Sequence, residues 1–175
     1  MDFVKNYLDS SHFEFKRYKT LGDKTFAQLG DSDILWKHQE EDNSISQIVK
    51  HISGNMLSRW TNFLSEDGEK PWRHRDTEFE KPFTTKTEMI VAWEKGWQCL
   101  FDALASINPD NFNSLVKIRN EEHTIVEAVN RQLAHYANHV GQIVLLGKMV
   151  KGDNWVSLSI PKGESEVFNK EKFNT

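Results

Sequence analysis

The sequence contains very little cysteine and no long apolar run. Its 175 residues include a single cysteine, Cys99, so neither a disulfide within the chain nor a metal site made of several thiolates can form. Cys99 stands among apolar neighbours, and we expect it to be a small, inert core side chain. No segment approaches the roughly 20 apolar residues of a membrane span, and the N-terminus lacks the basic-then-apolar order of a signal peptide. We therefore expect a protein of the reducing cytoplasm with no membrane partner.

A basic face is also missing. The 22 lysines and arginines are outnumbered by 26 acidic residues, which gives a formal net charge of -4. The most basic stretch, residues 70–75, is flanked by acidic residues on both sides. Because a nucleic-acid-binding protein usually carries a basic patch, we expect no nucleic-acid partner. The length and an apolar content of 38% indicate one globular domain, which we expect to span residues 1–175.

The four prolines fall between long stretches of helical periodicity. Apolar side chains recur every three to four positions over about 3–29, 44–64, 85–106 and 124–149. Each of the last three stretches opens with a capping box, in which Ser or Thr is followed three residues later by Gln or Glu. Four long amphipathic helices in one domain predict an all-α fold with a four-helix bundle.

Two of the expected connections are unusually long. Residues 65–84 would link the second and third helices, and residues 107–123 the third and fourth. A long link permits a crossover between parallel helices, and loops of this length are often functional. Within the second link we expect a short extended piece at 114–118, and after Gly152 an irregular C-terminal tail.

The most informative pair among the seven histidines is His135 and His139. Residues four apart lie one turn apart on the same helix face. A helical wheel places the pair beside the broad apolar side of its helix, so that both rings point toward the bundle interior or its rim. One metal ion could satisfy both imidazoles. The spacing alone leaves a second interpretation open, in which both are ordinary hydrogen-bonded histidines.

A third ligand should come from another helix. His51 lies at the edge of the apolar stripe of the second helix, where side chains face a neighbouring helix, and His12 in the first helix is the alternative. We expect the remaining histidines, at positions 38, 74 and 123, to lie on the surface or to make local hydrogen bonds. Three imidazoles would leave a coordination position open, as in catalytic zinc sites. Zinc or nickel is the first choice of divalent metal, and manganese and iron are alternatives.

Two segments resemble the DinB-like superfamily of proposed metalloenzymes. They are residues 48–55, which contain His51, and residues 130–143, in which His135 and His139 precede a Gly-Gln pair. Residues 67–72 and 157–161 are also similar to one uncharacterised branch of that superfamily. The resemblance covers nearly the whole chain.

The resemblance implies a bundle of up-down-down-up order, with the second and third helices parallel. It assigns the three metal-binding positions of the superfamily to His51, His135 and His139, and it implies a homodimer. The superfamily includes enzymes that transfer or use low-molecular-weight thiols such as bacillithiol and mycothiol.

Three functions remain open on this basis. The first is a metal-dependent transferase, in which the metal lowers the pKa of a small thiol so that it attacks an electrophile. Trp72, Arg73, Arg75 and Glu78 would then wall the substrate pocket, with an arginine pairing a substrate carboxylate; otherwise their loop is a solvated charged connector. The second is a metal-dependent hydrolase, although no glutamate stands between His135 and His139. The third is a non-catalytic metal-binding or dimerisation module.

Overall fold

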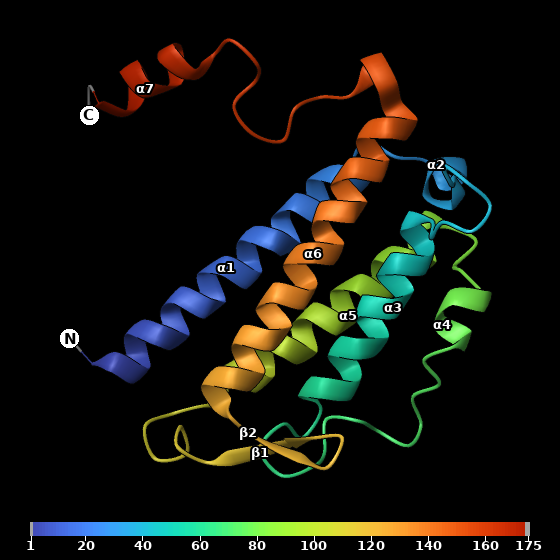
Figure 1. Cartoon of the computed structure of the whole chain (residues 1–175). Coiled ribbons are helices and arrows are strands. Elements are labelled where there is room, and N and C mark those ends of the chain that lie inside the picture. The colour runs from blue at the N-terminus through green and yellow to red at the C-terminus, as the bar shows by residue number, and fades with distance from the viewer. Residues whose placement is uncertain (1, 174–175) are drawn as a thin grey trace.

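The computed structural model describes residues 2–173 and is predominantly helical (Figure 1). Four helices are long, three are short, and a two-stranded sheet precedes the last long helix. In chain order the elements are α1 (Phe3–Phe26), α2 (Asp31–Leu35), α3 (Ile45–Trp60), α4 (Thr77–Glu80), α5 (Lys86–Ala105), β1 (Leu115–Ile118), β2 (Glu121–Thr124), α6 (Ile125–Lys151), the 3-10 turn η1 (Gly152–Asn154) and α7 (Ser165–Phe173).

Three of the long helices begin at the expected capping residues. The Oγ of Ser44 accepts a hydrogen bond from the Gln47 amide at 3.3 Å, and the Gln47 side chain accepts one from the Ser44 amide at 2.9 Å. Thr124 at the start of α6 forms the same reciprocal box. At α5 only half of the box forms, because Glu88 accepts from the hydroxyl of Thr84. These bonds satisfy amides that have no partner within the helix.

The core lies between the four long helices, where α3 packs along α5 and α1 along α6. Large aromatic side chains fill it: Trp60, Trp93, Trp97 and Tyr136 are all at most 2% exposed. Gly96 allows α3 and α5 to come close, since a Cβ at this position would lie 3.2 Å from the Cα of Ser53. Burial of aromatic rings on this scale is a main source of stability in such a core.

A short antiparallel hairpin lies where α6 begins, at one end of the long helices (Figure 1). Strand β1 pairs with β2, and the two residues of the turn, Arg119 and Asn120, have φ values of 56° and 62°. A two-residue turn with both φ values positive matches the right-handed twist of a hairpin. The hairpin therefore places the Arg119 side chain at a defined position.

The structure corrects the expectation of an all-α chain with an irregular tail. The extended piece expected at 114–118 pairs with residues 121–124 to form the sheet, and short helices occupy parts of the expected loops. The tail contains α7, whose acidic first turn and basic last turn suit the helix dipole and whose residues are all exposed. The first helix ends at Phe26 rather than near residue 29.

Among residues 2–173, no helix is both long enough and apolar enough to cross a membrane.

Candidate metal centre

The fold brings together three histidines from two helices. His51 lies on α3, and His135 and His139 lie one turn apart on α6. One ring nitrogen from each lies within 4.8 Å of the other two. The ring of His51 stands at 83° to that of His135 and at 68° to that of His139. Three imidazole nitrogens converging in this way could hold one divalent metal ion.

Two neighbouring side chains orient these rings. Glu78 Oε2 lies 2.9 Å from Nδ1 of His51, and Gln142 Oε1 lies 3.0 Å from Nδ1 of His139. Both oxygens accept hydrogen bonds, which assigns the proton to Nδ1 in each ring and leaves the lone pair on Nε2. Metal-binding histidines are commonly oriented by such partners. The Nε2 atoms of His135 and His139 lie 3.1 Å apart, close enough to share one ion.

The histidines on α6 are held in the neutral form that binds metals. Burial, followed by repulsion from the charged forms of His139 and His51, lowers the pKa of His135 to about 3. Burial also lowers the pKa of His139, although the hydrogen bond to Gln142 opposes this. Only a neutral imidazole can donate its lone pair to a metal, so the site does not have to lose protons at neutral pH before binding.

The Glu78 carboxylate links His51 to an arginine. Oε1 accepts from Nε of Arg73 at 2.9 Å, and Oε2 accepts from Nη2 at 3.0 Å, while the Glu78 side chain is only 8% exposed. Burial raises the pKa of Glu78, but the hydrogen bonds from His51 and Arg73 lower it by more, so that the pKa falls below its usual value. Glu78 is therefore an ionised acceptor on the far side of His51.

Gly54 makes room for this carboxylate against α3. A Cβ at position 54 would lie 2.3 Å from Oε1 of Glu78, which is well inside contact distance. Because Glu78 is held by His51 and Arg73, its carboxylate could move away only by weakening those bonds. The absence of a side chain at Gly54 thus allows α4 to approach the metal centre.

A cavity of about 210 Å³ opens beside the three histidines. The residues that α3 contributes are spaced by four, and those from α6 lie at positions 131, 132 and 135, so each set lies on one side of its helix. The 65–76 loop and the hairpin turn complete the wall. The lining residues are His51, Asn55 and Arg59 from α3, Arg73 and Arg75 from the loop, Arg119 from the turn, and Arg131, Gln132 and His135 from α6.

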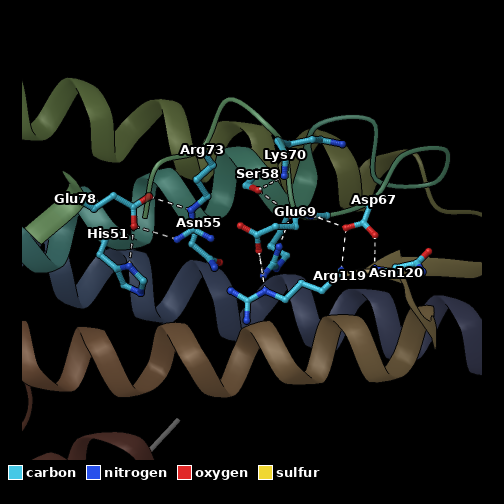
Figure 2. A network of polar contacts seen from close by, with 12 residues as sticks. His51, Asn55, Ser58, Asp67, Glu69, Lys70, Arg73, Glu78, Arg119 and Asn120 are labelled. Carbon is cyan, nitrogen blue, oxygen red and sulfur yellow. Dashed lines mark hydrogen bonds and ion pairs between the residues drawn. The ribbon is translucent and has the colours of Figure 1, made fainter. Parts of the chain in front are cut away.

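A network of polar contacts holds the loop in place (Figure 2). Asp67 accepts from the backbone amides of Arg119 and Asn120 at 2.9 and 2.6 Å, and thereby ties the loop to the hairpin turn. Glu69 bridges Arg59 and Arg119, with 3.1 Å to a nitrogen of each. The hydrogen bonds from Arg119 and Arg59 outweigh burial and lower the pKa of Glu69. The loop is thus an ordered wall of the cavity and not a solvated connector.

The residues expected to wall a substrate pocket lie in different surroundings. Arg73 and Arg75 line the cavity. Glu78 lies behind His51 and touches the metal centre only through that ring. Trp72 is 53% exposed and does not line the cavity.

The structure also shows the surroundings of His12, the alternative third ligand, and of Cys99, the single cysteine. The ring of His12 packs against Phe101 at 4.9 Å and does not join the histidine group. Cys99 is half-buried, and burial raises the pKa of its thiol, so it has the character of an unreactive side chain.

Three lining residues, Arg59, Arg119 and Arg131, were not singled out from the sequence, whereas Asn55 was expected to extend the polar edge that begins at His51. Arg59 follows His51 by two intervals of four, and Arg131 precedes His135 by four. This spacing was the available signal, because it places each residue on the same face as a ligand. No such signal exists for Arg119, whose position depends on the contact between Asp67 and the hairpin.

The sequence matches a protein family over nearly its whole length. The family described as "Protein of unknown function (DUF1572)", which is grouped with the DinB-like proteins, matches residues 2–164. Neither the curated proteins nor the solved structures gave a match. The match covers nearly the whole chain, including all three histidines and every residue that lines the cavity. The chain therefore belongs to the DUF1572 family.

Proposed function

We propose that the protein is a metal-dependent transferase that joins a low-molecular-weight thiol to an electrophilic substrate. The observation that carries the proposal is the convergence of His51, His135 and His139, each of which offers one ligand nitrogen within 4.8 Å of the others. Three protein nitrogens leave at least one coordination position open for a reactant, as in catalytic rather than structural zinc sites. Zinc or nickel would suit three imidazoles best, and manganese or iron would also be accepted.

A divalent ion bound there would act as a Lewis acid that lowers the pKa of a thiol. In the overall reaction the sulfur forms a bond to the electrophile, the electrophile loses its leaving group, and the thiol proton passes to solvent. The chain itself orients the ligands through Glu78 and Gln142. Arg73 and Arg75 lie where they would meet a substrate in the cavity. We propose substrate contacts for these two arginines, and an indirect role for Glu78 through His51. Trp72 lies outside the cavity, so we propose that it contacts only a substrate that extends beyond the cavity.

The cavity favours transfer over hydrolysis. A metal-dependent hydrolase usually places a carboxylate where it can take a proton from water. None of the described residues that line the cavity carries a carboxylate, and Glu78 is occupied by His51 and Arg73. We therefore prefer the thiol transferase to the hydrolase.

Metal content is the first test. Wild-type protein purified without added metal should contain close to one divalent ion per chain by inductively coupled plasma mass spectrometry. A variant with His135→Ala and His139→Ala should contain little. A variant with His12→Ala is the matched control, because His12 lies outside the group, and it should retain the ion. Equal metal content in all three proteins would contradict the site.

Activity is the second test. Metal-loaded protein, a panel of thiols including bacillithiol and mycothiol, and monobromobimane as the electrophile should give a rate above that of the uncatalysed reaction. The His135→Ala, His139→Ala variant should react at the background rate. A metal-loaded protein that gives no added rate with any thiol would instead be a non-catalytic metal-binding module.

We also propose the arrangement and assembly that the DinB-like resemblance implies. The four long helices α1, α3, α5 and α6 would form a bundle of up-down-down-up order, and two copies would form a homodimer in the cytoplasm. Exposed apolar side chains such as Phe13 and Leu145, at 65% and 58%, support an interface on the outside of the helices. Light scattering after size-exclusion chromatography should give twice the 20.4 kDa chain mass.

A further inference from the structure

The arginines of this chain are gathered at one place. The sequence contains six, at positions 17, 59, 73, 75, 119 and 131, and all but Arg17 line the 210 Å³ cavity. None of the lysines lines it. The five arginines come from α3, the 65–76 loop, the hairpin turn and α6, so the grouping does not follow from neighbouring positions in the sequence. In a chain with a net charge of -4, this concentration of positive charge is local.

The carboxylates nearby do not neutralise the group. Glu69 pairs with Arg59 and Arg119, and Glu78 with Arg73. Within residues 2–173, no carboxylate pairs with Arg131 or Arg75, and the Arg75 guanidinium lies over the Phe79 ring at 5.6 Å. Counting the carboxylates that form ion pairs with them, five guanidinium groups and two carboxylates leave a formal excess of three positive charges.

The floor of the cavity has hydrogen-bonding atoms without protein partners. Arg59 and Gln132 are 6% and 3% exposed, yet Nε of Arg59 and Oε1 of Gln132 have no hydrogen-bond partner among residues 2–173. Asn55 Oδ1 accepts from the Tyr136 hydroxyl at 2.9 Å, which leaves the Asn55 amide nitrogen free to donate. Buried polar atoms normally find partners, so unpaired ones in a cavity wall mark a place where a ligand can bind. The N–H groups of Arg59 and Asn55 can donate to an anion, whereas Oε1 of Gln132 can only accept from a donor group of the ligand.

The positive charges that line the cavity are all arginines and none is a lysine, and this choice indicates the kind of ligand. A guanidinium is planar and presents paired N–H groups that match the two oxygens of a carboxylate or phosphate. We propose that this cavity binds the anionic end of a substrate, a carboxylate or phosphate group, with Arg131 and Arg75 as its direct partners. Arg59, Arg73 and Asn55 form the positively charged and hydrogen-bonding floor beneath it.

The cavity lies beside the metal centre, since His51 and His135 line both. This inference deepens the proposed function and rests on it for the reacting end of the molecule. A substrate anchored by its anionic group would direct its thiol or its electrophilic carbon toward the three histidines. The expected substrate class is therefore a small molecule that carries one or more carboxylate or phosphate groups.

Calorimetric titration of the metal-loaded protein at an ionic strength of about 0.15 M, where charges more than about 8 Å apart at the surface are screened, provides the test. The probes are succinate for carboxylates and glycerol 3-phosphate for phosphates, with succinamide and glycerol as neutral counterparts. We expect the anions to bind and the neutral compounds not to bind, and the tighter anion identifies the group that the site prefers. Replacing Arg131→Gln or Arg75→Gln should weaken binding by about tenfold or more, because a charged hydrogen-bond partner is lost.

Arg17→Gln is the matched control, because it removes the same charge from the exposed surface of α1 outside the cavity. It should change the affinity by less than about twofold, since distant surface charges are screened by salt. The inference is overturned if neither anion binds, or if Arg131→Gln and Arg75→Gln bind as tightly as the wild type. It is also overturned if Arg17→Gln has an equal effect.

The two proposals fail separately. The proposed metal function fails if the chain carries no metal, while anion binding that depends on Arg131 and Arg75 would still support the cavity assignment. Conversely, one ion per chain with no affinity for succinate or glycerol 3-phosphate would overturn the cavity assignment and leave the metal site in place. A variant that unfolds at the same midpoint temperature as the wild type retains an intact fold.

Discussion

Glu78 accepts a hydrogen bond from Nδ1 of His51 at 2.9 Å, across 27 positions of sequence. The contact joins α4, a helix of only four residues, to a candidate ligand on α3. Through this bond Glu78 fixes the tautomer of His51 and turns Nε2 toward His135 and His139. The metal centre thus depends on a residue that would not itself touch the metal.

Replacing Glu78→Gln tests that dependence. The amide keeps the size of the carboxylate but weakens the hold on His51 and removes the ion pair with Arg73, so metal affinity should fall by about 10- to 100-fold. Competition with a fluorescent zinc chelator measures this. Glu80→Gln, an exposed change on the same helix, is the control and should bind metal like the wild type. An unchanged affinity in Glu78→Gln would remove Glu78 from the site.

Gly54→Ala should impair metal binding without altering any ligand. The new Cβ would lie 2.3 Å from Oε1 of Glu78, so the carboxylate must move and its bond to His51 must weaken. We expect a fall in affinity in the same direction as for Glu78→Gln, measured in the same competition assay. Gly141→Ala is the matched control, because nothing lies within 4 Å of its Cβ. Equal affinities in the two alanine variants would contradict the role given to Gly54.

Acid should destabilise the metal-free protein before the carboxylates titrate. The pKa of His135 is about 3 in the folded chain and about 6.5 when unfolded, so the unfolded state binds more protons below pH 6.5. The contribution of neutral His135 to the free energy of unfolding is therefore fully present above about pH 6.5 and is lost as the pH is lowered toward 3. Urea unfolding between pH 7 and pH 5 measures this, because the lowered pKa of Glu78 keeps that carboxylate ionised there.

The variant with His135→Ala and His139→Ala is the control for the acid effect. It lacks the two histidines whose pKa values are lowered, so its free energy of unfolding should change less between pH 7 and pH 5. If wild type and variant lose the same amount, these histidines are not the source of the acid sensitivity.

Asp67→Ala should lower stability by about 1–3 kcal/mol, because three backbone amides lose a charged acceptor. These amides belong to Glu69, Arg119 and Asn120. Burial raises the pKa of Asp67, but these three bonds lower it by more, so the carboxylate is ionised at neutral pH. Urea unfolding at pH 7 is the measurement. Asp110→Ala, an exposed change in another loop, should have little effect.

The parts predictable from the sequence are those set by local patterns. Capping residues such as Ser44 and Thr124 gave the helix starts, because their bonds reach only three residues along the chain. The spacing of His135 and His139 gave the α6 half of the metal centre. His51 was inferred as the third member from its place at the edge of an apolar stripe, and the structure places it within reach of both.

The remaining features depend on contacts between distant segments. Glu78 meets His51 only because Gly54 leaves space on α3, and the hairpin turn is fixed by Asp67, 52 positions before Arg119. Short helices such as α4 have too few residues to show the helical spacing of apolar side chains in the sequence. The cavity could not be foreseen for the same reason, since its arginines come from four separate elements.

The crowding of guanidinium groups beside the three histidines links the binding of the metal to the binding of the anion. Burial and the two other histidines are the main causes of the lowered pKa of His135, and the charges of Arg73 and Arg59 lower it further. The same field opposes the arrival of a divalent cation. An anion in the cavity would offset it, so metal and anion should each increase the affinity for the other by an equal factor. The apparent metal affinity of this protein would then depend on the buffer anion, and the occupied centre would form most readily when its substrate is present.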